Sequence, residues 1–156
     1  GNIIWLPLYV FLLYAIFKQE KQQGWIILLG IVLVITMADQ LTSSVIKPWI
    51  MRLRPSWNDG FAGLVHTVDG YRGGRFGFPS SHAANTFGVA TFLCFLFATP
   101  ASRWLFLWAA VVSYSRIYLG VHYPSDILAG WAAASVWTVS AYVLVYRNGI
   151  RPWHSA

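Results

Sequence analysis

The sequence predicts an all-α membrane protein, a polytopic bundle of transmembrane helices that forms one domain over residues 1–156. Of its 156 residues, 57% are hydrophobic and only 10% are charged, whereas soluble domains carry about a quarter charged residues. The apolar residues form blocks long enough to cross a bilayer, which takes about 20 residues per helix. Polar turns and one long polar loop separate these blocks, and we expect neither a linker nor a second domain.

The net charge of +6 is typical of proteins that bind nucleic acid or anionic lipid. The Lys and Arg residues lie in loops between apolar blocks rather than in a basic arm. This placement argues against a nucleic-acid partner and for a lipid bilayer. The single cysteine, Cys94, lies inside an apolar block, so the sequence has no disulfide framework. The oligomeric state is left open.

The first two of five visible spans are expected at residues 3–17 and 25–46. The first is short for a span and contains Pro7, and the polar residues 18–23 form the turn after it. The second is expected to stop at Lys47-Pro48, because proline cannot donate a backbone hydrogen bond. The chain begins with Gly and has no basic n-region before its first apolar block, so this block is not a signal peptide. We expect a trimmed start and a missing earlier helix.

A long polar loop follows, from about residue 49 to residue 79. It is rich in glycine and aromatic residues, as suits a loop at the level of the lipid headgroups, and it contains Arg52, Arg54, Arg72 and Arg75. Pro48 and Pro55 are expected to open and end a short helix. Lys47 and Arg54, seven residues apart, would then share one helical face. The alternative is that both are interfacial cations that snorkel to the headgroups.

The third span, residues 81–98, opens at Pro79-Ser80-Ser81-His82. Ser80 is the expected N-cap. The free amides of such a start, with the helix dipole, favour a bound anion. His82 lies in the first turn, where it could give a proton to that anion. The alternative is a capped helix start with an incidental histidine.

The last two spans, residues 104–119 and 125–146, enclose Arg116, His122 and Asp126. An ionisable residue inside a span, such as Arg116, is costly unless it is paired or functional. A carboxylate at Asp126 would orient the His122 imidazole and make its other nitrogen a better nucleophile or base. The alternative is a buried Arg116–Asp126 ion pair with His122 as a bystander.

Counting the crossings places residues 47–79 and 116–126 on one face of the membrane. The opposite face receives Lys18, Lys21, Arg103, Arg147 and Arg151. Both faces are basic, so the positive-inside rule does not decide between them. The cations of the first face cluster more than anchoring requires. We therefore expect that face outside the cytoplasm.

Three motifs together resemble those of the type 2 phosphatidic acid phosphatase (PAP2) superfamily, over about residues 3–146. Lys47-x6-Arg54-Pro55 resembles its K-x6-R-P motif, and Ser115-Arg116-x5-His122-x3-Asp126 matches its S-R-x5-H-x3-D motif. Pro79-Ser80-Ser81-His82 resembles its P-S-G-H motif, with Ser81 in place of glycine. The family uses backbone amides there, so serine should be tolerated, although its hydroxyl would crowd or contact the phosphate.

The resemblance implies a role for each matching residue. His122 would be the nucleophile that forms a phosphohistidine, oriented by Asp126, and His82 would be the general acid. The phosphoryl oxygens would be held by Lys47, Arg54, Ser80, Ser81 and Arg116. No cofactor is expected. A two-metal phosphatase needs a cluster of carboxylates or histidines, and the acids near this face are only Asp59, Asp69 and Asp126.

The family's membrane members have six spans and a site on the outer face, which implies a bacterial inner-membrane protein whose site faces the periplasm or the cell exterior. The implied function is hydrolysis of a lipid phosphate or diphosphate. Undecaprenyl diphosphate, phosphatidylglycerophosphate, phosphatidate and the lipid A phosphates are all compatible substrates. The alternatives are a non-catalytic protein that binds anionic lipid, and an enzyme like the vanadate-dependent haloperoxidases, which are soluble.

Five further polar residues stand apart from the motifs. Asp39 is expected to pair with Gln40, Ser43 or a Trp rather than to relay protons. Arg72 and Arg75 would read the rest of the substrate head or only meet anionic lipid. His66 and His154 are expected on the surface.

Overall fold

The computed structural model describes residues 6–61 and 63–153. Regular secondary structure in these ranges is helical, and an isolated antiparallel bridge joins Leu53 to Phe76. The α-helices are α1 (Leu6–Glu20), α2 (Gly24–Asp39), α3 (Lys47–Ile50), α4 (Ser81–Phe97), α5 (Trp104–Tyr118) and α6 (Pro124–Arg147). The shorter elements are the 3-10 turns η2 (Lys21–Gln23), η4 (Pro55–Trp57), η5 (Asp59–Phe61) and η6 (Pro100–Arg103), and the π-helix η3 (Gln40–Ile46). The predicted all-α class is confirmed for these ranges.

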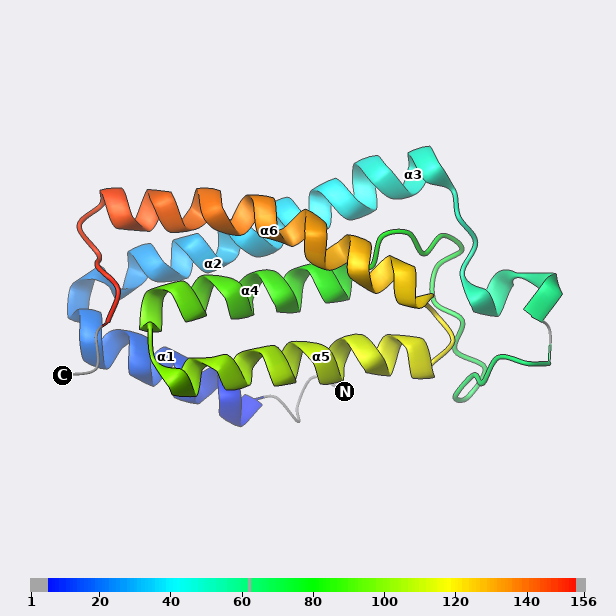
Figure 1. The fold of residues 1–156 in the computed structure, drawn as a ribbon, viewed down its shortest axis with the longest axis horizontal. Helices are drawn as coiled ribbons and strands as arrows, with labels where there is room; N and C mark the ends of the chain where they lie inside the picture. Colours follow the sequence, from blue (N-terminus) through cyan, green and yellow to red (C-terminus); the bar gives the residue numbers. More distant parts are fainter. Residues whose placement is uncertain (1–5, 62, 154–156) are drawn as a thin grey trace.

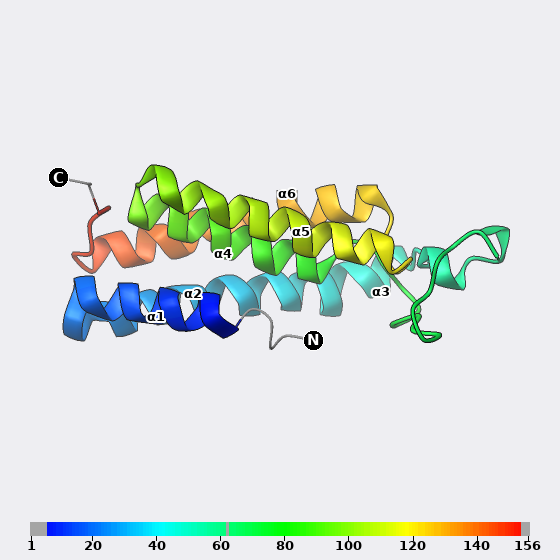
Figure 2. The ribbon, with the colours of Figure 1, turned by 90° about the horizontal axis from the view of Figure 1, so that it is seen from below.

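The long helices lie lengthwise beside one another, and the chain reverses direction between them (Figures 1 and 2). The first reversal is at Lys21, whose φ is +48°. Pro7 lies in the first turn of α1, where the missing N–H has no helical partner to lose. Residues 3–5, at which the first block was expected to begin, and His154 lie outside the described residues.

The second predicted span does not stop at Lys47-Pro48. Helix α2 continues through η3 into α3, and in the π-helix the N–H of Lys47 donates to the carbonyl of Thr42, five residues earlier. The helix ends at Met51, which is left-handed (φ 51°) and donates to the Lys47 carbonyl at 2.9 Å. Arg54 is extended (φ −68°, ψ 155°), as residues before proline tend to be. The predicted short helix with Lys47 and Arg54 on one face is therefore wrong.

The core runs along the inner faces of the helices, and its largest fully buried side chains include Ile16, Ile27, Val34, Phe92, Leu96 and Val145. Helices α4 and α6 pack closely at Gly130, where a Cβ atom would lie 2.6 Å from the Ser80 carbonyl oxygen. This glycine lets the start of α4 pack against α6, which matters because both helices carry predicted site residues.

The outer faces of the helices are apolar. Large exposed side chains include Val10, Phe11, Leu29, Val32, Leu107 and Val136, each more than half exposed, and contiguous apolar surface of this kind fits lipid rather than water. Two helical stretches, Leu6–Ile50 and Pro124–Arg147, are long and apolar enough to cross a membrane, and α4 is a shorter apolar helix. These features indicate a membrane protein, while the count of five spans stays a prediction.

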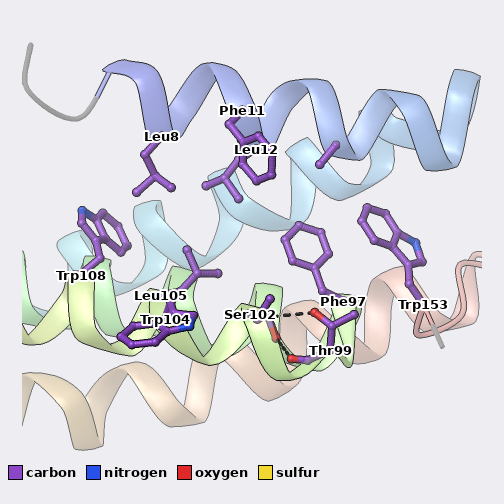
Figure 3. A pocket seen from close by; sticks show the side chains of 12 residues that line it. Leu8, Phe11, Leu12, Phe97, Thr99, Ser102, Trp104, Leu105, Trp108 and Trp153 are labelled. Carbon is purple, nitrogen blue, oxygen red and sulfur yellow. Dashed lines mark hydrogen bonds between the residues drawn. The ribbon is translucent and has the colours of Figure 1, made fainter. Parts of the chain in front are cut away.

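The two ends of the molecule differ in chemistry. One end holds η2, η6 and the end of α6, and the other holds the end of α3, the loop of residues 51–80, the end of α5 and the start of α6 (Figure 1). An apolar cavity of about 370 Å³ lies between α1 and the α4–η6–α5 turn, toward the first end (Figure 3). Its lining includes Leu8, Leu12, Phe97, Leu105 and Trp153 and contains no ionisable side chain. Both ends carry cations, but the predicted site residues lie at the second end.

Candidate active site

The residues that the sequence singles out meet at this second end. Lys47 opens α3, Ser80 is the N-cap of α4, and Ser81 and His82 lie in its first turn. Arg116 lies in the last turn of α5, and Asp126 lies in the first turn of α6. The two remaining residues, Arg54 and His122, lie in the connecting loops.

His122 and Asp126 form a buried pair. Their side chains are 2% and 0% exposed, and His122 Nδ1 lies 3.3 Å from Asp126 Oδ2. The same oxygen accepts the Tyr123 N–H at 2.9 Å, while Oδ1 accepts Arg52 Nη1 at 3.0 Å. Among the described residues, the ion pairs of this carboxylate are with Arg52 and His122. The alternative of an Arg116–Asp126 ion pair is therefore wrong.

Several groups act on the proton affinity of His122. Burial lowers the pKa of His122, its hydrogen bond to Asp126 opposes that change, and the charges of Arg54 and Lys47 lower the pKa further. The net direction is below the ordinary value, so the imidazole is neutral at neutral pH. With Nδ1 held by Asp126, the lone pair of Nε2 is available to attack an electrophile.

The start of α4 is joined to the start of α6. The Ser80 hydroxyl accepts the Ala83 N–H at 3.4 Å, which confirms Ser80 as the N-cap, and the Ser80 N–H donates to the Asp126 carbonyl at 2.9 Å. Ser80 is fully buried, whereas His82, two residues further along the chain, is exposed. The joint places His82 at the same end as His122 and leaves its ring accessible to a ligand.

The Ser81 hydroxyl contacts the α2–α3 helix. It receives Lys47 Nζ at 2.7 Å and lies 2.7 Å from the Thr42 hydroxyl and 2.9 Å from the Ser43 hydroxyl. In this structure the Ser81 hydroxyl holds Lys47, and the predicted contact with a phosphate stays a prediction. Ser43 donates in turn to Asp39 at 3.3 Å, so the expected pairing of Asp39 is confirmed.

The Arg54 side chain lies between the loop of residues 73–77 and the His122–Asp126 pair. Its Nε donates to the Phe76 carbonyl at 3.1 Å. A Cβ atom at Gly77 would lie 3.1 Å from both Arg54 Cγ and Asp126 Oδ2, and 3.5 Å from His122 Nδ1. Glycine at this position therefore allows the arginine stem to pack against the pair, and a larger residue would separate them.

Arg116 presents a buried donor. Its Nε is buried and has no hydrogen-bond partner among the described residues. Leaving a buried charged donor unsatisfied is costly, and an oxyanion would satisfy it. Three cations and a helix N-terminus at one end can stabilise charge on the oxygens of a phosphoryl group. No group of three His, Cys, Asp or Glu side chains in residues 6–61 and 63–153 is placed to hold a metal.

Sequence reasoning missed three residues of this site: Arg52, Thr42 and Ser43. Arg52 had a detectable signal, because residues two apart on an extended segment point to the same side and Arg54 belongs to the recognised motif. Thr42 and Ser43 had none. Their contact with Ser81 depends on the π-helix, which no pattern in the sequence indicates.

Comparisons with known proteins agree with the motifs. The PAP2 superfamily model matches residues 28–150. The chain is 47% identical over 136 residues to a lipid A 4'-phosphatase of Bacteroides thetaiotaomicron. The matched region covers 83% of this chain and 59% of that protein. The chain is 38% identical to a lipid A 4'-phosphatase of Porphyromonas gingivalis (81% and 54% covered) and 31% identical to an undecaprenyl-diphosphatase of Sulfolobus acidocaldarius (85% and 59% covered). The chain thus spans little more than half the length of these relatives. No solved structure matches it.

Proposed function

The chain belongs to the PAP2 superfamily, and from this membership and the geometry of its polar end we propose that it hydrolyses a lipid phosphate or diphosphate through a phosphohistidine. One observation carries the proposal. The buried His122–Asp126 pair lies at the same end of the molecule as Arg116, whose buried Nε has no hydrogen-bond partner among the described residues. A nucleophile and an oxyanion site are thereby combined at one end of the molecule.

In the first step, His122 Nε2 attacks phosphorus and the bond to the lipid oxygen breaks. His82 gives its proton to the departing oxygen, and Asp126 stabilises the positive charge that develops on the His122 ring. In the second step, water attacks the phosphohistidine, phosphate leaves, and His122 is regenerated. Lys47, Arg54 and Arg116 stabilise the phosphoryl oxygens throughout, with help from the amides at Ser80 and Ser81. These residues supply the required charge stabilisation without a metal.

The substrate we propose is a phosphorylated glycolipid of the lipid A type. The support is the 47% identity to a lipid A 4'-phosphatase over 83% of this chain. The more distant undecaprenyl-diphosphatase makes a prenyl diphosphate the next substrate to test. We further propose that the helices cross a bacterial inner membrane and that the site faces the periplasm or the cell exterior.

The test is phosphate release by purified protein from a panel of lipid A, prenyl diphosphate, phosphatidate and phosphatidylglycerophosphate. We expect release from at least one of these lipids, and trapping of an acid-labile phosphoprotein after a brief incubation. His122→Ala should abolish both. His66→Ala is the matched control, because His66 is an exposed histidine whose ring packs against that of Tyr118, and it should retain activity.

Three results would contradict the proposal. Binding of these lipids without turnover would favour a non-catalytic protein that binds anionic lipid. Full activity of His122→Ala would contradict the covalent step. Chelation with EDTA should leave turnover intact, and a loss that Mg²⁺ or Zn²⁺ restores would contradict the metal-free mechanism.

A further inference from the structure

The carboxylate of Asp126 is held from both sides. Its Oδ2 faces His122 Nδ1 at 3.3 Å and accepts the Tyr123 N–H at 2.9 Å, and its Oδ1 accepts Arg52 Nη1 at 3.0 Å. The first oxygen sets the orientation of the imidazole. The second oxygen accepts a hydrogen bond from Arg52, which is not one of the defined positions of the motif Lys47-x6-Arg54-Pro55.

We propose that Arg52 is a positioning residue, which fixes the Asp126 carboxylate and through it the His122 imidazole. This inference rests on the proposed function. Asp126 is completely buried, and a buried carboxylate that loses one partner reorients toward those that remain. Without Arg52, Oδ1 would lose its charged donor, and the carboxylate would no longer be fixed in the plane that serves His122.

Arg52 is itself well fixed. Its Nη1 also donates to the Ser125 hydroxyl at 2.8 Å, and its guanidinium carbon lies 4.3 Å from the centre of the Tyr123 ring. Its backbone carbonyl accepts the Gly77 N–H at 2.9 Å. An arginine can make such simultaneous contacts because its donors form a rigid planar fork that also stacks on aromatic rings, which a lysine ammonium cannot reproduce.

The contacts of Arg52 also distinguish it from a phosphate ligand. Its Nη1 is committed to Asp126 and Ser125, whereas Arg116 has a buried Nε without a partner among the described residues. Arg52 Nη1 therefore acts on the carboxylate, and Arg116 Nε is a buried donor available for an oxyanion.

A double-mutant cycle tests this role. The rate of phosphoenzyme formation is measured for wild type, Arg52→Gln, Asp126→Asn and the double variant. Arg52→Gln should lower that rate about 10- to 100-fold, by analogy with the loss when a residue that orients a metal-binding histidine is removed, with KM little changed. In the Asp126→Asn background the same substitution should have almost no effect, because its target is gone. Arg52→Lys should recover part of the rate.

Arg151→Gln is the matched control. Arg151 stacks on Tyr146 at 4.1 Å, as Arg52 does on Tyr123, but it lies at the opposite end, and its loss should leave the rate unchanged. Thermal unfolding of each variant checks the fold. The proposal would be overturned if Arg52→Gln lowered the rate of phosphoenzyme formation equally in the wild-type and Asp126→Asn backgrounds. It would also be overturned if Arg52→Gln raised KM at an unchanged rate, or did not lower the rate at all.

The same four variants can be compared without turnover by measuring the NMR chemical shifts of the His122 ring. Arg52→Gln should shift them when Asp126 is present and leave them unchanged in Asp126→Asn. Shifts in neither background would overturn the proposal for Arg52. Wild-type turnover and its loss in His122→Ala report separately on the proposed function, so the two failures are distinguishable.

Discussion

The His122 ring is subject to opposing influences on its proton affinity, and they predict a pH dependence. Burial and the charge of Arg54 lower the pKa of His122, and Asp126 raises it. A lowered pKa keeps the imidazole neutral, and therefore nucleophilic, to a lower pH. The acid limb set by His122 should thus lie below the ordinary histidine value of about 6.5.

Two substitutions should move this limb in opposite directions. Arg54→Gln removes a charge that lowers the pKa, so the limb should move to higher pH. Asp126→Asn removes the group that raises it, so the limb should move to lower pH while the rate falls, by up to about 10⁴-fold. The measurement is kcat/KM against pH with one aryl phosphate. The ionisation of that substrate is common to all variants, and coinciding limbs would show that His122 does not set them.

His82 should matter in proportion to the basicity of the leaving oxygen. It is exposed at the start of α4, where it can reach a departing group. General acid help is worth about 10²–10⁴-fold when a strongly basic alkoxide leaves, and a nitrophenolate needs far less. His82→Ala should therefore cripple hydrolysis of a lipid monophosphate and spare much of the burst phase with p-nitrophenyl phosphate. Equal losses on both substrates would make His82 a binding residue.

The element that most directly affects Lys47 is the π-helix η3. Ser43 faces Ser81 and Lys47, whereas its neighbour Ser44 is exposed and donates to Gln40. Removing a hydrogen bond to a charged group costs about 1.5–3 kcal/mol, so Ser81→Ala should lower kcat/KM by about tenfold or more.

The paired serines separate this positioning effect from a general effect on the helix. Ser43→Ala should lower kcat/KM by a smaller factor than Ser81→Ala, because its contact with Lys47 is longer, at 3.4 Å against 2.7 Å. Ser44→Ala should leave activity unchanged. Equal activities in all three variants would show that the hydroxyl cluster does not position Lys47.

The helices themselves follow closely from the sequence. Apolar blocks, prolines and the Ser80 cap place α4, α5 and α6 within a residue or two of their predicted bounds. The segment from Gln40 to Arg54 could not be predicted in this way. The π-helix is accompanied by contacts between Thr42, Ser43 and Ser81, which lie almost 40 residues apart, and Arg54 is positioned by pairing with the loop near Phe76. Local propensity contains no information on either contact.

At the scale of the whole molecule, the spacing of the motifs was enough to predict that eight site residues lie at one end, because each motif flanks a helix terminus. The pairing of Asp126 with His122 was predicted from the sequence, but its pairing with Arg52 was not. Its bond to Arg52 crosses between a loop and a helix 74 residues later, and only the folded chain brings them together.

The last prediction concerns the orientation of the molecule in the membrane. If the site end faces outward, Leu64, which is 81% exposed in the polar loop, lies outside, and Asn148, exposed after α6 at the other end, lies in the cytoplasm. Because Cys94 is the single cysteine, a Cys94→Ser background allows one new thiol at a time. In intact cells, a membrane-impermeant maleimide should label Leu64→Cys and spare Asn148→Cys until the cells are permeabilised. The reverse pattern would place the site in the cytoplasm, and labelling of both before permeabilisation would contradict a membrane crossing between them.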